Sequence, residues 1–215
     1  MKLPKPDDFE SPPPGLAPAV CIGLIDLGTQ KTEFKGQAKT NRQIRILFEL
    51  LDGSRKDGSP FTISRKYTFS MSERSNLRAD LESWRTKPFT PEEFETFDMR
   101  NLIGITCTLN IKQADKNGRT STFIDGVMAR LKGAAPKVKP RAETVYFSLD
   151  EFDATTFAKL HDKTQELIKL SPEYHEAVGD RVPDQHDDGG DDFGNNNSVA
   201  SGSRYAGQID DEVPF

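Results

Sequence analysis

Five stretches of β-like pattern, interrupted once by helical spacing, are the feature that most constrains how this chain folds. The β-like stretches lie near residues 19–28, 42–51, 61–69, 105–111 and 120–128. The second of them alternates well and places four apolar residues on one strand face, namely Ile44, Ile46, Phe48 and Leu50. Asn117-Gly118 lies between the last two stretches and is a strong hairpin signal. Gly23 inside the first stretch predicts a bulge or strong coiling of that strand.

Between residues 72 and 104 the apolar spacing becomes that of a helix. Leu77, Leu81 and Trp84 share one helical face, so we interpret Trp84 as a core residue and not as a stacking platform. Thr90-Pro91-Glu92-Glu93 predicts a helix start with a capping box. Five strands with a helical insert between the third and the fourth match the order of an OB-fold, a five-stranded Greek-key barrel that can bind oligonucleotides. The predicted fold class is therefore mainly β, an OB barrel with helical additions.

The remaining segments predict one domain with an arm before it and a tail after it. Residues 1–18 are rich in proline and charge and predict an irregular arm, so the domain spans 19–178. Residues 132–141 predict a basic linker, and the capping box at 148–151 predicts a C-terminal helix over 148–170, which Pro172 stops. Residues 179–215 are rich in Asp, Gly, Asn and Ser and predict a disordered acidic tail.

Charge is divided unevenly between the tail and the rest of the chain. The whole chain has 29 Lys and Arg against 34 Asp and Glu, a net charge of −5. Residues 180–215 hold nine of the acids and two of the bases, net −7, so residues 1–179 hold 27 bases and 25 acids, net +2. We call residues 1–179 the body. A slightly basic body joined to an acidic tail is the combination expected when the body binds a polyanion and the tail mimics one.

Several classes of function are not supported by the sequence. No apolar run approaches the roughly 18–20 residues of a membrane span, and the first residues lack the apolar core of a signal peptide, so we expect a protein of the bacterial cytoplasm. Cys21 and Cys107 lie in β-like apolar stretches and are interpreted as buried free thiols. Neither a zinc signature, nor a phosphate-binding glycine loop, nor a deaminase motif is present, so we expect no enzyme, no cofactor and no metal.

Basic and aromatic residues are interleaved along the predicted strands and their loops. Binding of single strands without sequence preference needs cations along the phosphates and aromatic faces for the bases. Aromatics on barrel strands usually fill the core, and we favour this reading for Phe48, Phe61 and Phe69. Tyr67 and Phe34 are better candidates for exposed stacking, and Arg45 and Lys66 point away from the most apolar face of their strands. The candidate DNA-binding residues are Phe34, Lys35, Arg42, Arg45, Arg65, Lys66, Tyr67, Lys112, Arg119 and Phe123.

The last six residues combine acids with an apolar plug. They are Asp210, Asp211, Glu212, Val213, Pro214 and Phe215, which we call the tip. Such a sequence suits a partner with a basic rim and an apolar pocket, with Phe215 as the anchor and the acids as steering charges. The tip resembles the end of bacterial and phage single-stranded DNA-binding proteins, an acidic run followed by Pro-Phe. The alternative is an acidic solubilising end that closes on an apolar residue by chance.

A second resemblance covers residues 20–133, over half of the chain. It rests on Asn76–Arg85 (NLRADLESWR), then on Pro88-Phe89, Asn101-Leu102-Ile103-Gly104, Asn117-Gly118 and Gly133. These motifs are similar to a family of tailed-phage proteins associated with single-stranded DNA binding by an OB domain. The resemblance implies support of replication, recombination or repair in a phage or prophage. The insert at 72–104 and the helix after Ser148 depart from the bacterial single-strand binders, so only the tip residues correspond position by position.

The resulting hypothesis is a non-enzymatic single-stranded DNA-binding protein that recruits replication and repair enzymes through its tip. The rival is an interaction protein that captures such enzymes with the tip and whose body does not bind DNA. A third reading is a recombination annealing factor. A titration with fluorescent oligo-dT at several salt concentrations separates the first two readings.

Overall fold

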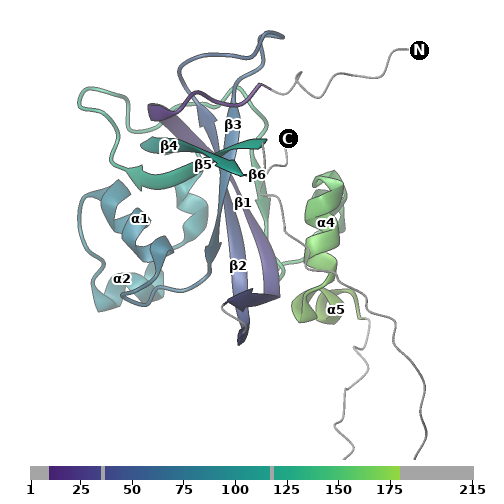
Figure 1. The fold of residues 1–215 in the computed structure, drawn as a ribbon. Coiled ribbons are helices and arrows are strands. Elements are labelled where there is room, and N and C mark those ends of the chain that lie inside the picture. Colours follow the sequence, from purple (N-terminus) through teal and green to yellow (C-terminus); the bar gives the residue numbers. More distant parts are fainter. Residues whose placement is uncertain (1–9, 35–36, 117–118, 180–215) are drawn as a thin grey trace, which may run out of the picture.

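The computed structural model describes residues 10–34, 37–116 and 119–179, with the side chains of 33–37 and 116–119 outside the description (Figure 1). The backbone forms a mainly β structure with helices on both sides of the sheet. The strands are β1 (Gly15–Phe34), β2 (Gln37–Leu50), β3 (Thr62–Thr68), β4 (Thr106–Lys116), β5 (Arg119–Met128) and β6 (Val145–Phe147). The five predicted strands and the helical insert between the third and the fourth are confirmed, whereas β6 was not expected.

The sheet is open, with the strand order β3-β2-β1-β4-β5. Neighbours on this path are antiparallel, and β6 pairs in parallel with residues Gly23–Ile25 of β1. The register of β1 against β2 shifts between Cys21 and Gly23 and again between Asp26 and Gly28. The bulge predicted at Gly23 is thus present. It lets β1 curve enough to pair with β4 in its first half and with β6 farther on.

The two bulge glycines also make room for the C-terminal part of the chain. A Cβ on Gly23 would lie 2.5 Å from Cγ1 of Val145, and one on Gly28 would lie 2.3 Å from Oγ of Ser171. Gly28 also has a φ of +68°, which favours glycine. Close packing against residues 145–171 therefore depends on the absence of side chains at these two positions.

The helical insert follows the sequence prediction closely. It contains α1 (Asn76–Arg85), α2 (Pro91–Thr96) and the 3₁₀ helix η2 (Met99–Leu102). Leu77, Leu81 and Trp84 are buried, and Nε1 of Trp84 donates to the carbonyl oxygen of Thr106 at 2.8 Å. The capping box of Thr90 and Glu93 at the start of α2 is present. Trp84 is therefore a core residue, as its spacing predicted.

The predicted single helix over 148–170 is wrong. The chain forms three short helices instead, α3 (Ala154–Lys159), α4 (Asp162–Lys169) and α5 (Pro172–Val178). The Ser148 hydroxyl accepts a local hydrogen bond from the Asp150 amide instead of starting a helix, and Asp153 caps α3. Leu160 and Ser171 have extended backbone and break the helical path. Pro172 begins α5 rather than ending a helix, because proline is tolerated in a first turn.

Two hydrophobic cores lie on opposite faces of the sheet. The first lies between the curved sheet and the insert and includes Phe48, Trp84 and both cysteines, which are buried free thiols as predicted. The second lies between β1, β2 and the C-terminal helices and is centred on Ile25, Leu47 and Ile168. In Figure 1, α1 and α2 accordingly lie on one side of the sheet, with α4 and α5 on the other. β2 is thus buried on both faces, which its alternating pattern did not predict.

Candidate nucleic-acid interface

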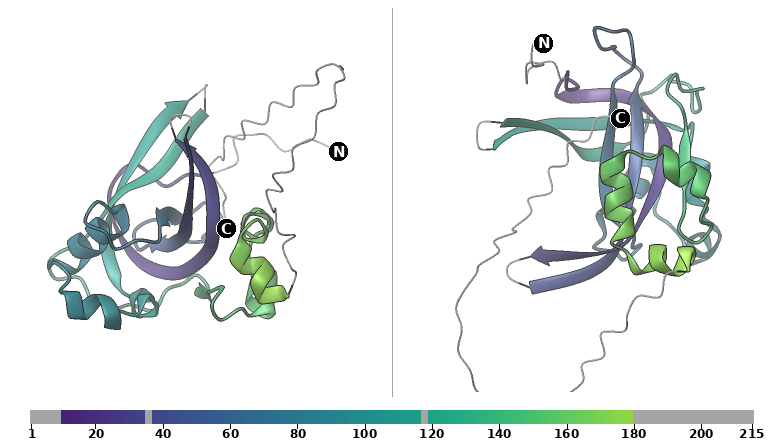
Figure 2. Two further views of the ribbon diagram at one scale, coloured as in Figure 1. Left: turned by 90° about the horizontal axis from the view of Figure 1, so that it is seen from below. Right: turned by 90° about the vertical axis from the view of Figure 1, so that its right-hand side faces the viewer.

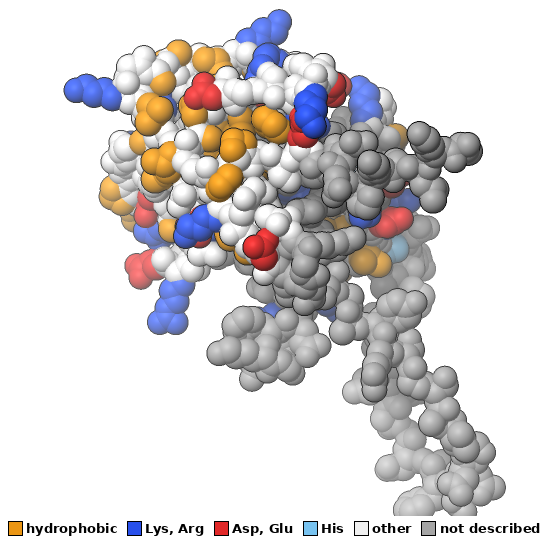
Figure 3. Space-filling model, turned by 45° about the horizontal axis from the view of Figure 1, so that its top comes forward, with side chains coloured by type: hydrophobic (Ala, Val, Ile, Leu, Met, Phe, Trp, Pro, Cys, Tyr) orange, Lys and Arg blue, Asp and Glu red, His pale blue; other side chains and the backbone are white. Residues whose placement is uncertain are grey.

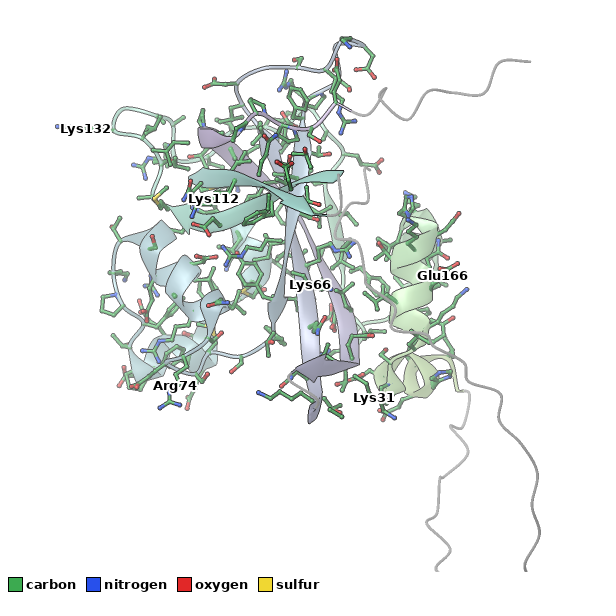
Figure 4. All side chains as sticks on the ribbon, viewed as in Figure 1. Lys31, Lys66, Arg74, Lys112, Lys132 and Glu166 are labelled. Carbon is green, nitrogen blue, oxygen red and sulfur yellow. The ribbon has the colours of Figure 1, made fainter. Side chains whose placement is uncertain are left out.

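Two hairpin arms extend beyond the cores. In the β1–β2 hairpin, residues 31–32 and 38–40 are exposed, and in the β4–β5 hairpin, residues 112–115 are exposed, whichever face they occupy. Figure 2 shows both arms projecting on the same side of the molecule. Lys31 and Lys39 lie on the first arm and Lys112 on the second. In the view of Figure 4, Lys112 is labelled above Lys66 and Lys31 below it. Arms exposed on both faces contribute little to the core and are available to bind a ligand.

The outer face of β1, β4 and β5 carries exposed apolar and polar side chains together. Leu16 is opposite Asn110, and Lys112 is opposite Phe123. Leu16 is 67% exposed and Phe123 is 38% exposed. We call Leu16, Asn110, Lys112, Phe123 and Asp125 the hairpin face. Figure 3 shows hydrophobic side chains gathered on one face of the molecule, with lysines and arginines around them.

Asp125 is the partner of the basic group on the hairpin face. Its Oδ2 lies 2.8 Å from Nζ of Lys112 and 3.2 Å from Nδ2 of Asn110. Both members of the ion pair are about half exposed, so the pair contributes little to stability. A phosphate group could therefore replace Asp125 as the partner of Lys112 at small cost. The hairpin face can offer an apolar aromatic surface and a cation side by side.

Tyr67, which the sequence marked for exposed stacking, is buried, so that expectation is wrong. Its hydroxyl donates to Oδ2 of Asp80 in α1 at 2.7 Å, and burial with the adjacent carboxylate raises its pKa. Nη1 of Arg65 lies 2.9 Å from the same oxygen, and the guanidinium lies over the Tyr67 ring. The Val127 amide of β5 donates to Oδ1 of Asp80 at 3.4 Å. Tyr67 and Arg65 thus hold α1 between β3 and β5.

Arg45, expected on the solvent side of its strand, is buried under α4. Its Nη1 donates to Oγ1 of Thr164 at 3.0 Å. Lys66 is opposite Arg45 in the register and is partly exposed. The outer face of β2 is therefore covered by the C-terminal helices where the sequence placed a phosphate contact. A continuous row of apolar residues on the outer face of β2 would have predicted that this face is covered. Arg45 and Glu49 interrupt that row, so the sequence of β2 gives no such signal.

Arg42 joins the β1–β2 hairpin to the chain after β6. Its Nη2 lies 2.5 Å from Oδ2 of Asp26 and 2.8 Å from Oδ1 of Asp150. Its hydrogen bond to Asp26, together with Asp150, raises the pKa of the guanidinium. The guanidinium also lies 6.0 Å from the ring centre of Phe69, which is 45% exposed. The core assignment of Phe69 is therefore wrong, whereas Phe48 is buried and Phe61 packs against the core.

The other candidates divide into those on the hairpin face and those outside the description. Lys112 and Phe123 lie opposite each other, as a basic and aromatic pair should. The side chains of Phe34, Lys35 and Arg119 lie outside the described residues, as do Asp210 to Phe215. Leu16, Lys31 and Lys39 were missed. The signal for Lys31 and Lys39 was present in the sequence as polar and charged residues that continue the two strands beyond their buried parts. Leu16 lay in the irregular arm predicted over 1–18, and that prediction is wrong for residues 15–18, because β1 begins at Gly15 and pairs there with β4.

Residues 10–34, 37–116 and 119–179 contain no group of three or more His, Cys, Asp or Glu side chains placed to hold a metal ion. None of the helices in these ranges has the length and apolar character needed to span a membrane. Comparison of the sequence with protein-family models and with curated proteins finds no match.

Proposed function

We propose that this protein binds single-stranded DNA, without being an enzyme, and that the two hairpin arms and the hairpin face form the interface. The observation that carries the proposal is the position of the arms. They are the β1–β2 and β4–β5 connections, and in OB domains these two connections bind oligonucleotides. Both arms project on one side of the molecule, and their described residues include Lys31, Lys39 and Lys112. Fold analogy alone does not assign a function, so the side chains on the arms are the part to test.

The strand path supports an OB barrel as the finer description of the fold. The order β3-β2-β1-β4-β5 is that of an OB barrel opened between β3 and β5. Asp80 of α1 lies in this opening and accepts hydrogen bonds from Tyr67 of β3 and from the Val127 amide of β5. We propose that α1 completes the barrel there through side chains instead of a strand ladder.

DNA would follow the arms instead of the face of β2 and β3. The usual OB interface includes that face, but α4 covers Arg45 here. Phe123 would stack on a base, and Lys112 would exchange Asp125 for a phosphate. The tail would recruit replication and repair enzymes through the tip in the cytoplasm of a bacterial host, in a phage or prophage setting.

A titration of the full chain with fluorescent oligo-dT of about 30 nucleotides tests the proposal. We expect binding whose logarithmic salt slope is about −0.7 for each phosphate neutralised. Oligonucleotides of mixed sequence should bind similarly, because stacking does not distinguish bases strongly. Failure to bind at low salt would leave the rival in which the protein captures enzymes with its tip and its body binds no DNA.

A further inference from the structure

A cavity of about 510 Å³ lies between the helical insert and the loop after β5. Its apolar lining includes Leu81, Trp84, Phe89, Phe97 and Leu102. The rings of Phe89 and Phe97 are 5.0 Å apart, edge to face, and the Trp84 indole N–H is already bonded to Thr106. A ligand in the cavity therefore contacts an apolar surface and does not need to accept a hydrogen bond from the Trp84 indole N–H. The volume falls within the usual range for sites that hold a small molecule or a few side chains.

One rim of this cavity is strongly basic. Arg130, Lys132 and Gly133 line it, and the segment from Ala129 to Arg141 contains five Lys or Arg and no acid. The basic residues of the segment are Arg130, Lys132, Lys137, Lys139 and Arg141. Arg130 and Lys132 are exposed, and Lys132 extends from the loop away from the sheet (Figure 4). Arg85 also lines the cavity, and its Nη2 is paired with Oε1 of Glu93 at 2.6 Å. An occupant should therefore be acidic where it meets the loop and apolar where it enters the cavity.

We propose that the tip, Asp210–Phe215 of the same chain, docks in this cavity. Its three consecutive acids would meet Arg130 and Lys132, and the side chains of Val213, Pro214 and Phe215 would enter the apolar part. The sign of the charge and the order of acids before apolar residues both match the cavity. Docking would hide the tip until a partner with a better pocket competes for it. This inference does not depend on DNA binding by the arms.

The chain between α5 and the tip is long enough for this contact. About 30 residues separate Gly179 from Asp210, and they span up to roughly 100 Å when extended. As a coil they would have an end-to-end distance of roughly 30 Å, comparable with the width of a domain of this size, whose radius of gyration is about 15 Å. A tether of this length holds the tip near the body at an effective concentration approaching millimolar. Weak contacts are enough to keep it docked at that concentration.

Trp84 provides the test, because it is the only tryptophan of the chain and lines the cavity. The emission of Trp84 should differ between the full chain and its Phe215→Ala variant, independently of protein concentration. Adding a peptide of residues 207–215 to Phe215→Ala should restore the original emission, and a scrambled peptide should not. Arg130→Glu combined with Lys132→Glu should weaken the peptide at least about tenfold, the factor expected from one lost charge-assisted hydrogen bond.

The matched control is Lys163→Glu with Lys169→Glu, which reverses two exposed charges on α4 away from the cavity. Equal weakening by this pair would show non-specific attraction and overturn the proposal. Identical Trp84 emission in the full chain and in Phe215→Ala, with no binding of the peptide, would overturn it as well. An effect of oligo-dT on Trp84 that requires Arg130 and Lys132, with none of the peptide, would assign the cavity to nucleic acid instead. Failure of oligo-dT to bind at all would affect only the proposed function.

Discussion

At the scale of single residues, Phe123 and Lys112 separate base stacking from phosphate contact. Phe123→Ala should weaken oligo-dT binding by about 1–3 kcal/mol with little change of salt slope, because it removes a stacking surface. Lys112→Gln should reduce the size of the slope by about 0.7, one phosphate contact. Asp125→Asn should tighten binding, since Lys112 loses a competing partner. Thr122→Ala, on the other face of the same hairpin, is the matched control. Equal effects of Phe123→Ala and Thr122→Ala would exclude the hairpin face as the interface.

For Tyr67 and Asp80 we predict an effect on stability and none on DNA binding, because their hydrogen bond holds α1 on the sheet. Tyr67→Phe should lower the free energy of unfolding by about 1.5–3 kcal/mol, the usual value of a hydrogen bond to a charged group. Tyr67→Ala should cost about 3 kcal/mol or more, as for other buried aromatics. Neither change should alter the DNA affinity of the folded protein. Urea unfolding together with an oligo-dT titration checks both. Unchanged stability with weaker DNA binding would contradict the structural role of Tyr67 and would support a role in DNA binding.

At the scale of elements, the sequence predicts structure well where the apolar pattern is local. The alternation around Phe48, the stripe ending at Trp84 and the capping box at Thr90 each depend on neighbours within a few residues, and each is confirmed. The covering of Arg45 and the burial of Tyr67 depend on segments far along the chain, Thr164 and Asp80. A residue that is buried by a distant segment shows no periodic apolar pattern in its own strand. The exposure of the candidate interface residues was therefore the hardest feature to predict from the sequence. The C-terminal helices were misjudged because the break at Leu160 is a backbone extension with no Pro or Gly beside it, whereas the break at Ser171 precedes Pro172, which the sequence did mark.

The packing of α5 on β1 gives a prediction at this scale. Gly28→Ala should destabilise the protein clearly more than Gly58→Ala. Both positions have positive φ, +68° and +82°, so both lose a similar amount to backbone strain. An added Cβ at Gly28 meets Ser171, the N-cap of α5, and also Cδ1 of Leu149, whereas nothing described lies within 4 Å at Gly58. The difference between the two free energies of unfolding, measured in urea, therefore reports the close approach of Ser171 and Leu149 to β1. Equal costs would mean that Ser171 and Leu149 do not pack on β1 as described.

At the scale of the whole molecule, the two halves of the charge distribution are expected to act on each other. The body carries a net charge of +2 and residues 180–215 carry −7. Lys31, Lys39 and Lys112 place part of the body's positive charge on the arms. The acids of the tail, at the high effective concentration of a tether, should compete with DNA for these arms. Such competition acts on DNA affinity through charge, whereas the tip acts on partners through its apolar residues.

Three proteins separate these two roles: the full chain, a chain lacking only Phe215, and a chain lacking residues 180–215. Deleting 180–215 should tighten oligo-dT binding modestly, most clearly at low salt, because screening then weakens the competing acids least. Removing Phe215 alone should leave DNA affinity nearly unchanged, since every acidic side chain remains. It should nevertheless abolish recovery of partner enzymes from a bacterial lysate, because the aromatic anchor is gone. Equal recovery with the full chain and with the chain lacking Phe215 would contradict the role of the tip in partner docking, even if the arms bind DNA as proposed.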